Sequence, residues 1–363
     1  MARAAENMGK IRVALAGIGN NASSFVQGMR YYKNSDAERR PGLIHYDIGG
    51  YKLSDFELVA AFDVDRNKVG KDVSEAIFTL PTNTPKWIEV PKLGVEVMMG
   101  PIKDSLDGET IKTVVKPADR KPVDVADVLS KTRADVLVNF LPTGSVEAVR
   151  AYADACLKEA KVGFCNGMPT FVANDAEYAK IAEKNRVPLI GDDTKSQVGG
   201  SYLNRGLAKL MADRGVRVTK SYQVNIGGDM DFFNMEDTKR VASKHKSKTA
   251  SVKSSIPYDF EFYNHNGYIP WLGATKICYI RIEGLNYGGN MMTIDAKLRV
   301  IDSTNSVACM VDAVRCCKLA QDRGIGGVLL SPSAYYCKQP PEQLPDDQAR
   351  ARLEEFIAGK RQR

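Results

Sequence analysis

The sequence of 363 residues predicts an α/β protein, in which a Rossmann-like, doubly wound parallel sheet carries an inserted α+β domain. Three observations support this fold class. Apolar runs of strand length alternate with amphipathic segments up to about residue 200. A glycine-rich turn follows the first of these runs. Beyond residue 200 apolar and polar residues alternate within a strand, which is typical of antiparallel sheets with one solvated face.

Five apolar runs in the first part of the chain predict strands. Continuous apolar runs that end near Gly, Asp or Asn are typical of parallel strands buried on both faces. Amphipathic segments at 145–159 and 175–185 predict helices, and alternation of strands with helices favours a doubly wound sheet. The predicted strands lie at residues 11–19, 58–65, 135–142, 161–167 and 187–193.

The middle of the chain predicts a second, α+β unit. Its last strand alternates strictly, since Ile294 and Ala296 are flanked by Thr293, Asp295 and Lys297. The segment 81–125 predicts loops and short elements. The unit is expected to contain a helix at 201–213 and strands at 216–226, 279–285 and 293–300.

A helix should follow the second unit. Ser303, Thr304 and Asn305 offer N-cap oxygens for it, and Gly324 would lie just past its end. We expect this last segment to return to the first domain. The predicted nucleotide-binding domain therefore comprises residues 1–200 and 304–363, and the inserted domain comprises residues 201–303.

Composition excludes several protein classes. Hydrophobic residues make up 44% and charged residues 26%, which argues against disorder, collagen or a coiled coil for the whole chain. No run approaches the roughly 18 apolar residues of a membrane span, and the first residues show no apolar signal region. The seven cysteines include no C-x-x-C pair. We therefore expect a cytoplasmic protein with no membrane partner.

A dinucleotide-binding fingerprint, G-x-G-x-x-A, follows the first predicted strand and should open a helix that runs to about Tyr32. Its glycines permit a tight turn and let pyrophosphate approach the backbone, while the helix N-terminus presents free N–H groups to the anion. A Rossmann-like domain that binds no nucleotide is the alternative. The NAD contacts expected in the turn are Gly17, Ile18, Gly19, Asn20 and Asn21.

Asp63 is the nearest acid at a strand end after this turn. An acid that binds the adenosine ribose usually follows the turn by about 20 residues, and Asp63 follows it by about forty. The intervening residues would then form an inserted excursion. In that arrangement Asp63 would accept the ribose 2′-hydroxyl and favour NAD over NADP.

Residues 238–258 contain six basic side chains and no acidic one. In a helix Lys244 and Lys248 would share one face, and their repulsion is costly unless an anion such as phosphate lies between them. A solvated surface loop is the alternative. The formal net charge of +7 permits an anionic ligand. A nucleic-acid-binding arm is disfavoured because the segment has few aromatic residues for base stacking.

Eight stretches in order closely resemble one family, myo-inositol-1-phosphate synthase, and above all its shorter bacterial and archaeal branch. The resemblance covers nearly the whole chain, from Arg12 to about Phe356. The stretches are GIGNNASSFVQG (17–28), AAFDVD (60–65), VPLIGDDTKSQVG (187–199), NIGGDMDFFN (225–234), SKHKSK (243–248), IDSTNS (301–306), DRGIGG (322–327) and SAYYCKQPPEQLP (333–345).

The resemblance implies an isomerase that converts D-glucose 6-phosphate to 1L-myo-inositol 1-phosphate and recycles its NAD. The sugar is oxidised at C5, the resulting enolate closes the ring on C1, and the cyclic ketone is reduced again. Lysines would stabilise the negative charge that develops on oxygen, and crowding by other cations would lower a lysine's pKa. The resemblance also implies a homotetramer built through the inserted domain.

The family motifs assign functional roles to individual residues. The catalytic set would be Lys244, Lys248, Lys276, Lys338, Asp231 and Asp302. The phosphate and nicotinamide side of the cofactor would be lined by Asp193, Lys195 and Ser196, together with Asp231 and Lys244. Weaker cofactor contacts are expected at Asp72, Thr132 and Tyr152.

One position departs from the family, because the usual G-G-N-x-D motif has asparagine where this chain has Asp229. A second carboxylate near Asp231 could bind a cation, so we expect a stronger dependence on a divalent metal or a monovalent cation. No His, Cys and Asp cluster with ligand spacing supports a dedicated metal site. The alternative function is an NAD-dependent dehydrogenase that acts on a phosphorylated or amino-acid substrate. That function would not explain the cluster of four lysines that the family motifs imply.

Overall fold

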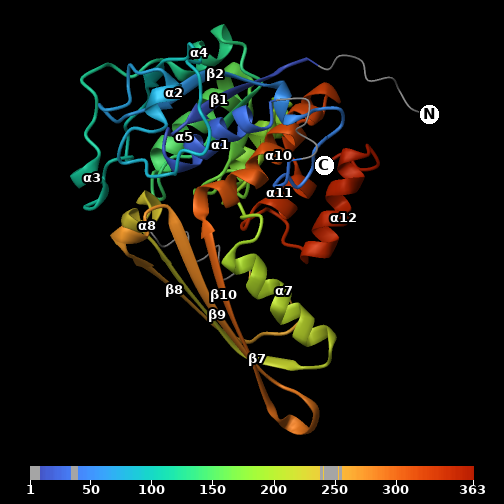
Figure 1. The fold of residues 1–363 in the computed structure, drawn as a ribbon. Coiled ribbons are helices and arrows are strands. Elements are labelled where there is room, and N and C mark those ends of the chain that lie inside the picture. The colour runs from blue at the N-terminus through green and yellow to red at the C-terminus, as the bar shows by residue number, and fades with distance from the viewer. Residues whose placement is uncertain (1–8, 34–39, 238–239, 241–251, 253–255) are drawn as a thin grey trace.

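The computed structural model describes residues 9–33, 40–237, 240, 252 and 256–363. Figure 1 shows a broad unit in which helices surround a parallel sheet, and an elongated four-stranded sheet that extends away from it. The chain leaves the parallel sheet after residue 190 and rejoins it at residue 327.

A seven-stranded parallel sheet forms the centre of the first unit in the described part of the chain. Its strands are β1 (Ile11–Ala16), β2 (Phe56–Asp63), β3 (Val97–Met99), β4 (Val136–Asn139), β5 (Gly163–Asn166), β6 (Pro188–Ile190) and β11 (Gly327–Val328). Their order is β11-β6-β5-β4-β1-β2-β3, so the strand order switches direction between β1 and β4. Doubly wound sheets bind ligands at the carboxyl ends of the strands beside such a switch point.

Helices cover both faces of this sheet. One face carries α1 (Asn20–Tyr31) and α10 (Asp302–Asp322). Val13 of β1 enters the core on that face, whereas the next residue, Ala14, enters the core on the other face. This arrangement confirms the interpretation of the apolar runs as strands buried on both sides. The second face carries α4 (Val125–Lys131), α5 (Val146–Asp154), the π-helix η3 (Ala155–Ala160) and α6 (Ala176–Lys184).

Shorter elements complete the first unit. The small helices η2, α2 and α3 lie in the connections that follow α1, β2 and β3, and two helices close the C-terminal part. Their bounds are η2 (Leu53–Asp55), α2 (Val73–Ala76), α3 (Ile111–Val114), α11 (Leu330–Tyr336) and α12 (Asp346–Ile357).

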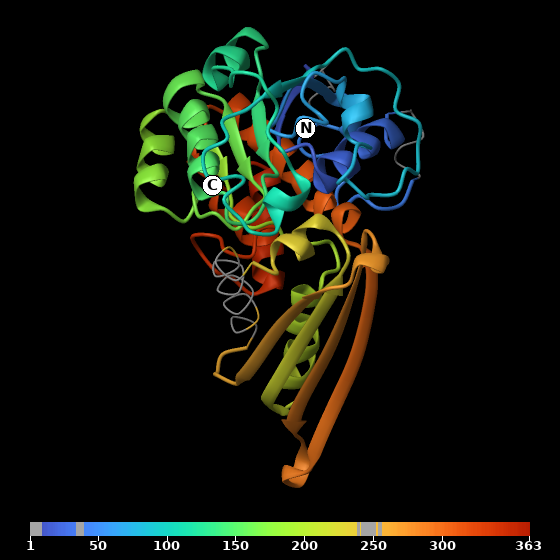
Figure 2. The same cartoon turned by 90° about the vertical axis from the view of Figure 1, so that its left-hand side faces the viewer.

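The second sheet is long and narrow, and α7 (Gly200–Asp213) packs against one of its faces (Figure 2). The strand order is β10-β9-β7-β8, in which β7 and β8 are parallel and the other pairs are antiparallel. In the described ranges, three short helices lie between the strands. The bounds are β7 (Arg217–Gly227), α8 (Met230–Asn234), β8 (Glu261–Tyr268), η4 (Pro270–Leu272), β9 (Thr275–Leu285), η5 (Tyr287–Gly289) and β10 (Met291–Ile301).

The structure confirms the predicted strand-helix order of the parallel sheet and the change to antiparallel pairing after α7, with two corrections. The strands β3, β8 and β11 were not predicted. The expected N-cap of α10 was wrong, because the helix begins at Asp302 and places Ser303, Thr304 and Asn305 in its first turn. The Asn305 amide instead donates to Val198 O at 2.7 Å, so it fixes the loop before α7.

The sequence predicts no membrane-spanning segment. Within the described ranges, no helix is both long enough and apolar enough to cross a bilayer.

Candidate active site

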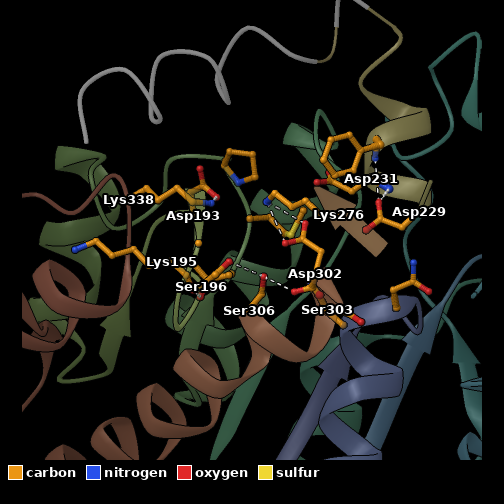
Figure 3. A pocket seen from close by; sticks show the side chains of 18 of the residues that line it. Asp193, Lys195, Ser196, Asp229, Asp231, Lys276, Asp302, Ser303, Ser306 and Lys338 are labelled. Carbon is orange, nitrogen blue, oxygen red and sulfur yellow. Dashed lines mark hydrogen bonds and ion pairs between the residues drawn. The ribbon is translucent and has the colours of Figure 1, made fainter. Parts of the chain in front are cut away.

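A large cavity lies between the carboxyl edge of the parallel sheet and the near end of the second sheet (Figure 3). It holds about 1260 Å³ of empty space, including its open mouth. The loops after β1, β5 and β6 meet α7, α8 and the first turn of α10 in its wall. The predicted site residues among its lining are Asn20, Asn21, Asp193, Lys195, Ser196, Asp231, Lys276, Asp302 and Lys338.

The glycine turn has the geometry that a dinucleotide needs. Gly17 has a φ of +87°, and a Cβ there would lie 2.7 Å from Phe140 O, so a side chain is excluded. A Cβ at Gly19 would meet none of the described atoms within 4 Å, so this residue faces open space. Gly19 is the N-cap of α1 and has no side chain to cap its first N–H groups. The turn therefore fits a pyrophosphate.

Asp63 supports the glycine turn directly. Its Oδ2 accepts a hydrogen bond from Ile18 N at 2.7 Å, and its Oδ1 accepts from Val64 N at 2.7 Å and Asp65 N at 2.9 Å. The carboxylate that was expected to bind the ribose therefore fixes the backbone of the turn, and its contact with a ribose stays a prediction. It lies in the wall of an adjoining cavity together with Gly17, Ile18, Gly19 and Tyr152.

This adjoining cavity contains buried polar atoms that lack a partner among the described residues. They are Asp65 Oδ2 and Ser105 Oγ, on side chains that are 1% and 4% exposed. Burial raises the pKa of Asp65. Buried polar atoms usually have a hydrogen-bond partner, so these two atoms fit a ligand with hydroxyl or amino groups, such as adenosine.

Two predicted cofactor contacts lie elsewhere. The backbone oxygen of Thr132 accepts from Arg12 Nε at 3.0 Å, at the amino end of β1 and therefore opposite the glycine turn. The Asp72 carboxylate caps α2 and accepts from Gly94 N at 2.7 Å, beside the start of β3. Thr132 therefore lies at the amino edge of the sheet, and Asp72 lies beside the edge strand β3. The structure therefore does not bring Thr132 and Asp72 to the cavity.

Two lysines of the predicted cluster form ion pairs at the cavity, as Figure 3 shows. Lys276 Nζ lies 3.0 Å from Asp302 Oδ1, because antiparallel pairing of β9 with β10 brings the start of one strand beside the end of the other. Lys338 Nζ lies 2.8 Å from Asp193 Oδ1. The partners are 26 residues apart in sequence in the first pair and 145 apart in the second.

The electrostatics of Lys276 differ from the sequence-based expectation. Burial lowers its pKa, but the neighbouring Asp302 carboxylate raises it, and the net direction is upward. The expectation of a pKa lowered by crowding is therefore wrong for Lys276. Its ammonium group also lies 5.8 Å from the centre of the Phe232 ring, so it remains a cation in a partly apolar setting.

Lys195 lines the cavity but directs its ammonium group away from it (Figure 3). The group donates to Ala334 O at 2.8 Å and to Asp346 Oδ1 at 3.2 Å. Arg205 Nε donates to the other oxygen of Asp346 at 2.8 Å. Burial lowers the pKa of Lys195. These contacts tie the loop after β6 and α7 to the start of α12, so the ammonium group of Lys195 is bound by protein atoms.

Lys244 and Lys248 lie outside the described residues, so their pairing stays a prediction. Arg240, in the same basic segment, is 7% exposed. Its Nε donates to Thr143 O at 3.0 Å, and Thr143 Oγ1 in turn donates to Asp231 Oδ1 at 2.9 Å. The alternative of a solvated basic face therefore does not hold for Arg240, which is held beside Asp231.

Sequence reasoning missed several residues of the cavity wall. Gln223 and Arg205 are among them, and so are Ser303 and Ser306 near the start of α10. Ser306 Oγ lies 3.3 Å from Ser196 Oγ. Gln223 and Arg205 belong to no motif in the sequence, and their proximity depends on how α7 packs on β7.

The described side chains include no group of three or more His, Cys, Asp or Glu placed to hold a metal ion. Asp229 instead caps α8, since its Oδ1 accepts from Asp231 N at 2.9 Å and from Phe232 N at 3.1 Å. The expected cation dependence stays a prediction.

Comparisons with known proteins identify the family to which this chain is similar. The family model of myo-inositol-1-phosphate synthase matches residues 199–303. The inositol-3-phosphate synthase of Mycobacterium tuberculosis is 46% identical over 355 residues, which cover 96% of each chain. That of Mycolicibacterium smegmatis is 47% identical and covers 98% of this chain and 99% of its own.

Solved structures show the same fold. A myo-inositol-1-phosphate synthase-related protein from Thermotoga maritima superposes with a TM-score of 0.76 at 24% identity, over 96% of this chain and 98% of its own. Inositol-3-phosphate synthase from Caenorhabditis elegans superposes with a TM-score of 0.74 at 14% identity, over 96% and 85%. Identity near one half over nearly the full length decides the assignment, and the chain belongs to the myo-inositol-1-phosphate synthase family.

Proposed function

We propose that this chain is an isomerase that converts D-glucose 6-phosphate to 1L-myo-inositol 1-phosphate. One observation carries the proposal: two lysine–carboxylate pairs, Lys276–Asp302 and Lys338–Asp193, line a cavity that adjoins the one lined by the open glycine turn. The glycine turn suits a dinucleotide and the lysine–carboxylate pairs suit an anionic sugar. The curated relatives of this chain carry the matching enzyme name.

The cofactor would be held by the glycine turn and by the adjoining cavity. Gly17, Ile18 and Gly19 would face the pyrophosphate, and Asp65 Oδ2 and Ser105 Oγ offer hydrogen-bonding atoms to adenosine. A bound NAD would supply the hydride acceptor for oxidation at C5 of the sugar and the hydride donor for the later reduction.

The sugar phosphate would lie near the N-terminus of α7. The first turn of this helix lines the cavity, contains no acidic residue and receives no side-chain cap from the described residues. Free N–H groups and the helix dipole favour an anion there, and Lys276 and Lys338 add positive charge. Lys244 and Lys248 would complete this cluster by resemblance to the family.

Lys276 would act as an electrostatic group. Because its pKa is raised, Lys276 Nζ keeps its proton at neutral pH and can donate hydrogen bonds to an oxyanion that forms on the sugar. Asp302 Oδ1 accepts from Lys276 Nζ and so orients it. We assign proton transfer to the remaining lysines and to Asp231, following the family resemblance.

We further propose a cytoplasmic homotetramer. All seven cysteines are free and buried, which suits a reducing compartment.

The face of the second sheet opposite α7 exposes aromatic side chains at Tyr222, Tyr263 and Tyr279, with exposed fractions of 41%, 72% and 40%. Exposed aromatic patches of this kind support association with further copies of the chain.

The test is an assay with D-glucose 6-phosphate and a catalytic amount of NAD. The proposal expects inositol phosphate without accumulation of NADH, whereas the alternative dehydrogenase would accumulate NADH in proportion to turnover.

The Lys276→Met variant should lose roughly 10²- to 10³-fold in turnover, since it removes one stabilising cation. Lys209→Met, at an exposed lysine on α7, should leave turnover unchanged. An active Lys276→Met enzyme would refute the assigned role.

A further inference from the structure

The inner face of β7 carries polar side chains where a sheet core is normally apolar. Ser221, Gln223 and Asn225 alternate along this face and are 5%, 2% and 0% exposed. Ser221 and Asn204 of α7 satisfy each other, with Asn204 Nδ2 donating at 3.0 Å and Ser221 Oγ donating at 3.2 Å. Buried polar groups are costly unless they are bonded, so each member of this row needs a partner.

Asn225 fixes the orientation of the row. Its Nδ2 donates toward the backbone oxygen of His265 at 3.4 Å and toward Asn264 Oδ1 at 3.1 Å. A backbone oxygen can only accept, so this end of Asn225 must be the amide nitrogen. The Oδ1 of Asn225 therefore points the other way, and it accepts from Gln223 Nε2 at 3.0 Å.

The same reasoning determines which atom of the Gln223 amide has no hydrogen-bond partner among the described residues. Because Asn225 Oδ1 requires a donor, the Gln223 end that touches it must be the nitrogen, and Oε1 is the remaining atom. Oε1 is buried and has no hydrogen-bond partner among the described residues. It is an acceptor, so the missing partner must donate a proton.

Gln223 lies in the wall of the large cavity, which Gly199 and Gly200 at the start of α7 also line. A Cβ at Gly200 would lie 2.7 Å from Gln223 Nε2 and 2.5 Å from Cys278 Sγ. The glycine thus allows the helix N-terminus to approach the sheet until Gln223 and the first turn of α7 share one wall. A ligand whose phosphate lies at that turn would bring its adjacent atoms to Gln223.

We propose that Gln223 Oε1 accepts a hydrogen bond from a hydroxyl group of the sugar, and so selects polyol phosphates over phosphates that lack that hydroxyl. This assignment rests on the proposed function. The chemistry matches because a sugar hydroxyl is a neutral donor that an uncharged acceptor can bind without competing with the lysines for the phosphate. A site built to accept from a hydroxyl discriminates strongly against ligands without it, since its own buried atom is then left unpaired.

The test measures binding of glucose 6-phosphate and of its 2-, 3- and 4-deoxy analogues to enzyme loaded with NADH, in which no turnover occurs. Gln223→Met should weaken binding of glucose 6-phosphate about tenfold, the order expected for one hydrogen bond to a buried acceptor. One deoxy analogue should bind the wild type and the variant equally, because it lacks the hydroxyl concerned. Gln223→Asn, which withdraws the oxygen by one methylene, serves if the methionine variant does not fold.

Ser221→Ala is the matched control, because Ser221 belongs to the same polar row but its partner is Asn204. It should leave all four affinities unchanged. Equal losses for all four ligands in the Gln223 variants would show a merely structural role and overturn the proposal, and so would unchanged affinities. Failure of the proposed function looks different, since the wild type would then bind no glucose 6-phosphate at all.

Discussion

At the scale of single residues, Asp229 combines a structural role with an electrostatic one. It caps α8 through Asp231 N and Phe232 N, and its charge helps to raise the pKa of Lys276. Asparagine caps helices about as well as aspartate, so Asp229→Asn should fold normally. The variant loses one negative charge from the cavity, and we expect its stimulation by Mg²⁺ or K⁺ to fall. Activity with and without chelator measures this effect.

The thermal unfolding midpoint of Asp229→Asn serves as the control, because a lost cap would lower it. A midpoint within about 2 °C of the wild type would show that the cap is retained. If the variant and the wild type respond equally to chelator and to added cations, the cation hypothesis for Asp229 is wrong. The pKa of Lys276 should move downward in the variant, because a neighbouring negative charge has been removed.

At the scale of elements, His45 joins α10 to α12. Its Nδ1 lies 2.6 Å from Asp312 Oδ2, and its Nε2 lies 3.1 Å from Glu354 Oε1. Burial and Arg350 lower the pKa of His45, but the two carboxylates raise it more, so its net pKa is above 6.5. A raised pKa stabilises the fold below pH 6.5, and this contribution is lost as pH rises through the folded-state pKa.

We therefore expect the unfolding midpoint of the wild type to fall as pH rises above 6.5. His45→Gln should be less stable than the wild type at pH 6, and its midpoint should change less over the same range. Thermal denaturation followed by circular dichroism at several pH values measures both trends. Identical slopes for the two proteins would show that another group governs this pH range.

The strands β1 and β8 illustrate why the sequence predicted some elements and not others. β1 was predicted because successive residues such as Val13 and Ala14 are apolar and enter the cores on opposite faces of the sheet. A short continuous apolar run of this kind is typical of a strand that is buried on both faces. β8 was missed because its inner residues include Asn264 and Asn266, which bond to Asn225 and interrupt the apolar alternation. The period of a strand can be recognised only where burial demands apolar side chains.

The candidate site was predictable where local geometry determines it. A glycine turn after a strand specifies Gly17, and the end of the next long strand specifies Asp63. Without the family resemblance, the pairing of Lys276 with Asp302 could not be derived, because it depends on the register of β9 against β10. Gln223 Oε1, which has no partner among the described residues, could not be derived either, since its setting depends on the close approach of α7 to β7.

At the scale of the whole molecule, the second sheet presents an extended exposed face and a projecting hairpin. Tyr263 is 72% exposed on the face, and Tyr287 and Met291 at the hairpin tip are 98% and 72% exposed (Figure 1). In the proposed tetramer the aromatic face would be buried, and a charge there would be desolvated without a partner. Tyr263→Asp should therefore dissociate the assembly. Leu80→Asp, at a leucine that is 74% exposed in the first unit, should not.

Light scattering coupled to size-exclusion chromatography separates these outcomes. The wild type and Leu80→Asp should have about four times the chain mass of 39.9 kDa, and Tyr263→Asp should shift to a dimer or a monomer at the same protein concentration. Because the cavity is lined by residues of one chain, the dissociated variant should still bind NADH. Its thermal unfolding midpoint should be lower than that of the wild type, since assembly adds to the apparent stability of the fold by mass action. A tetrameric Tyr263→Asp variant would place the interface elsewhere on the molecule.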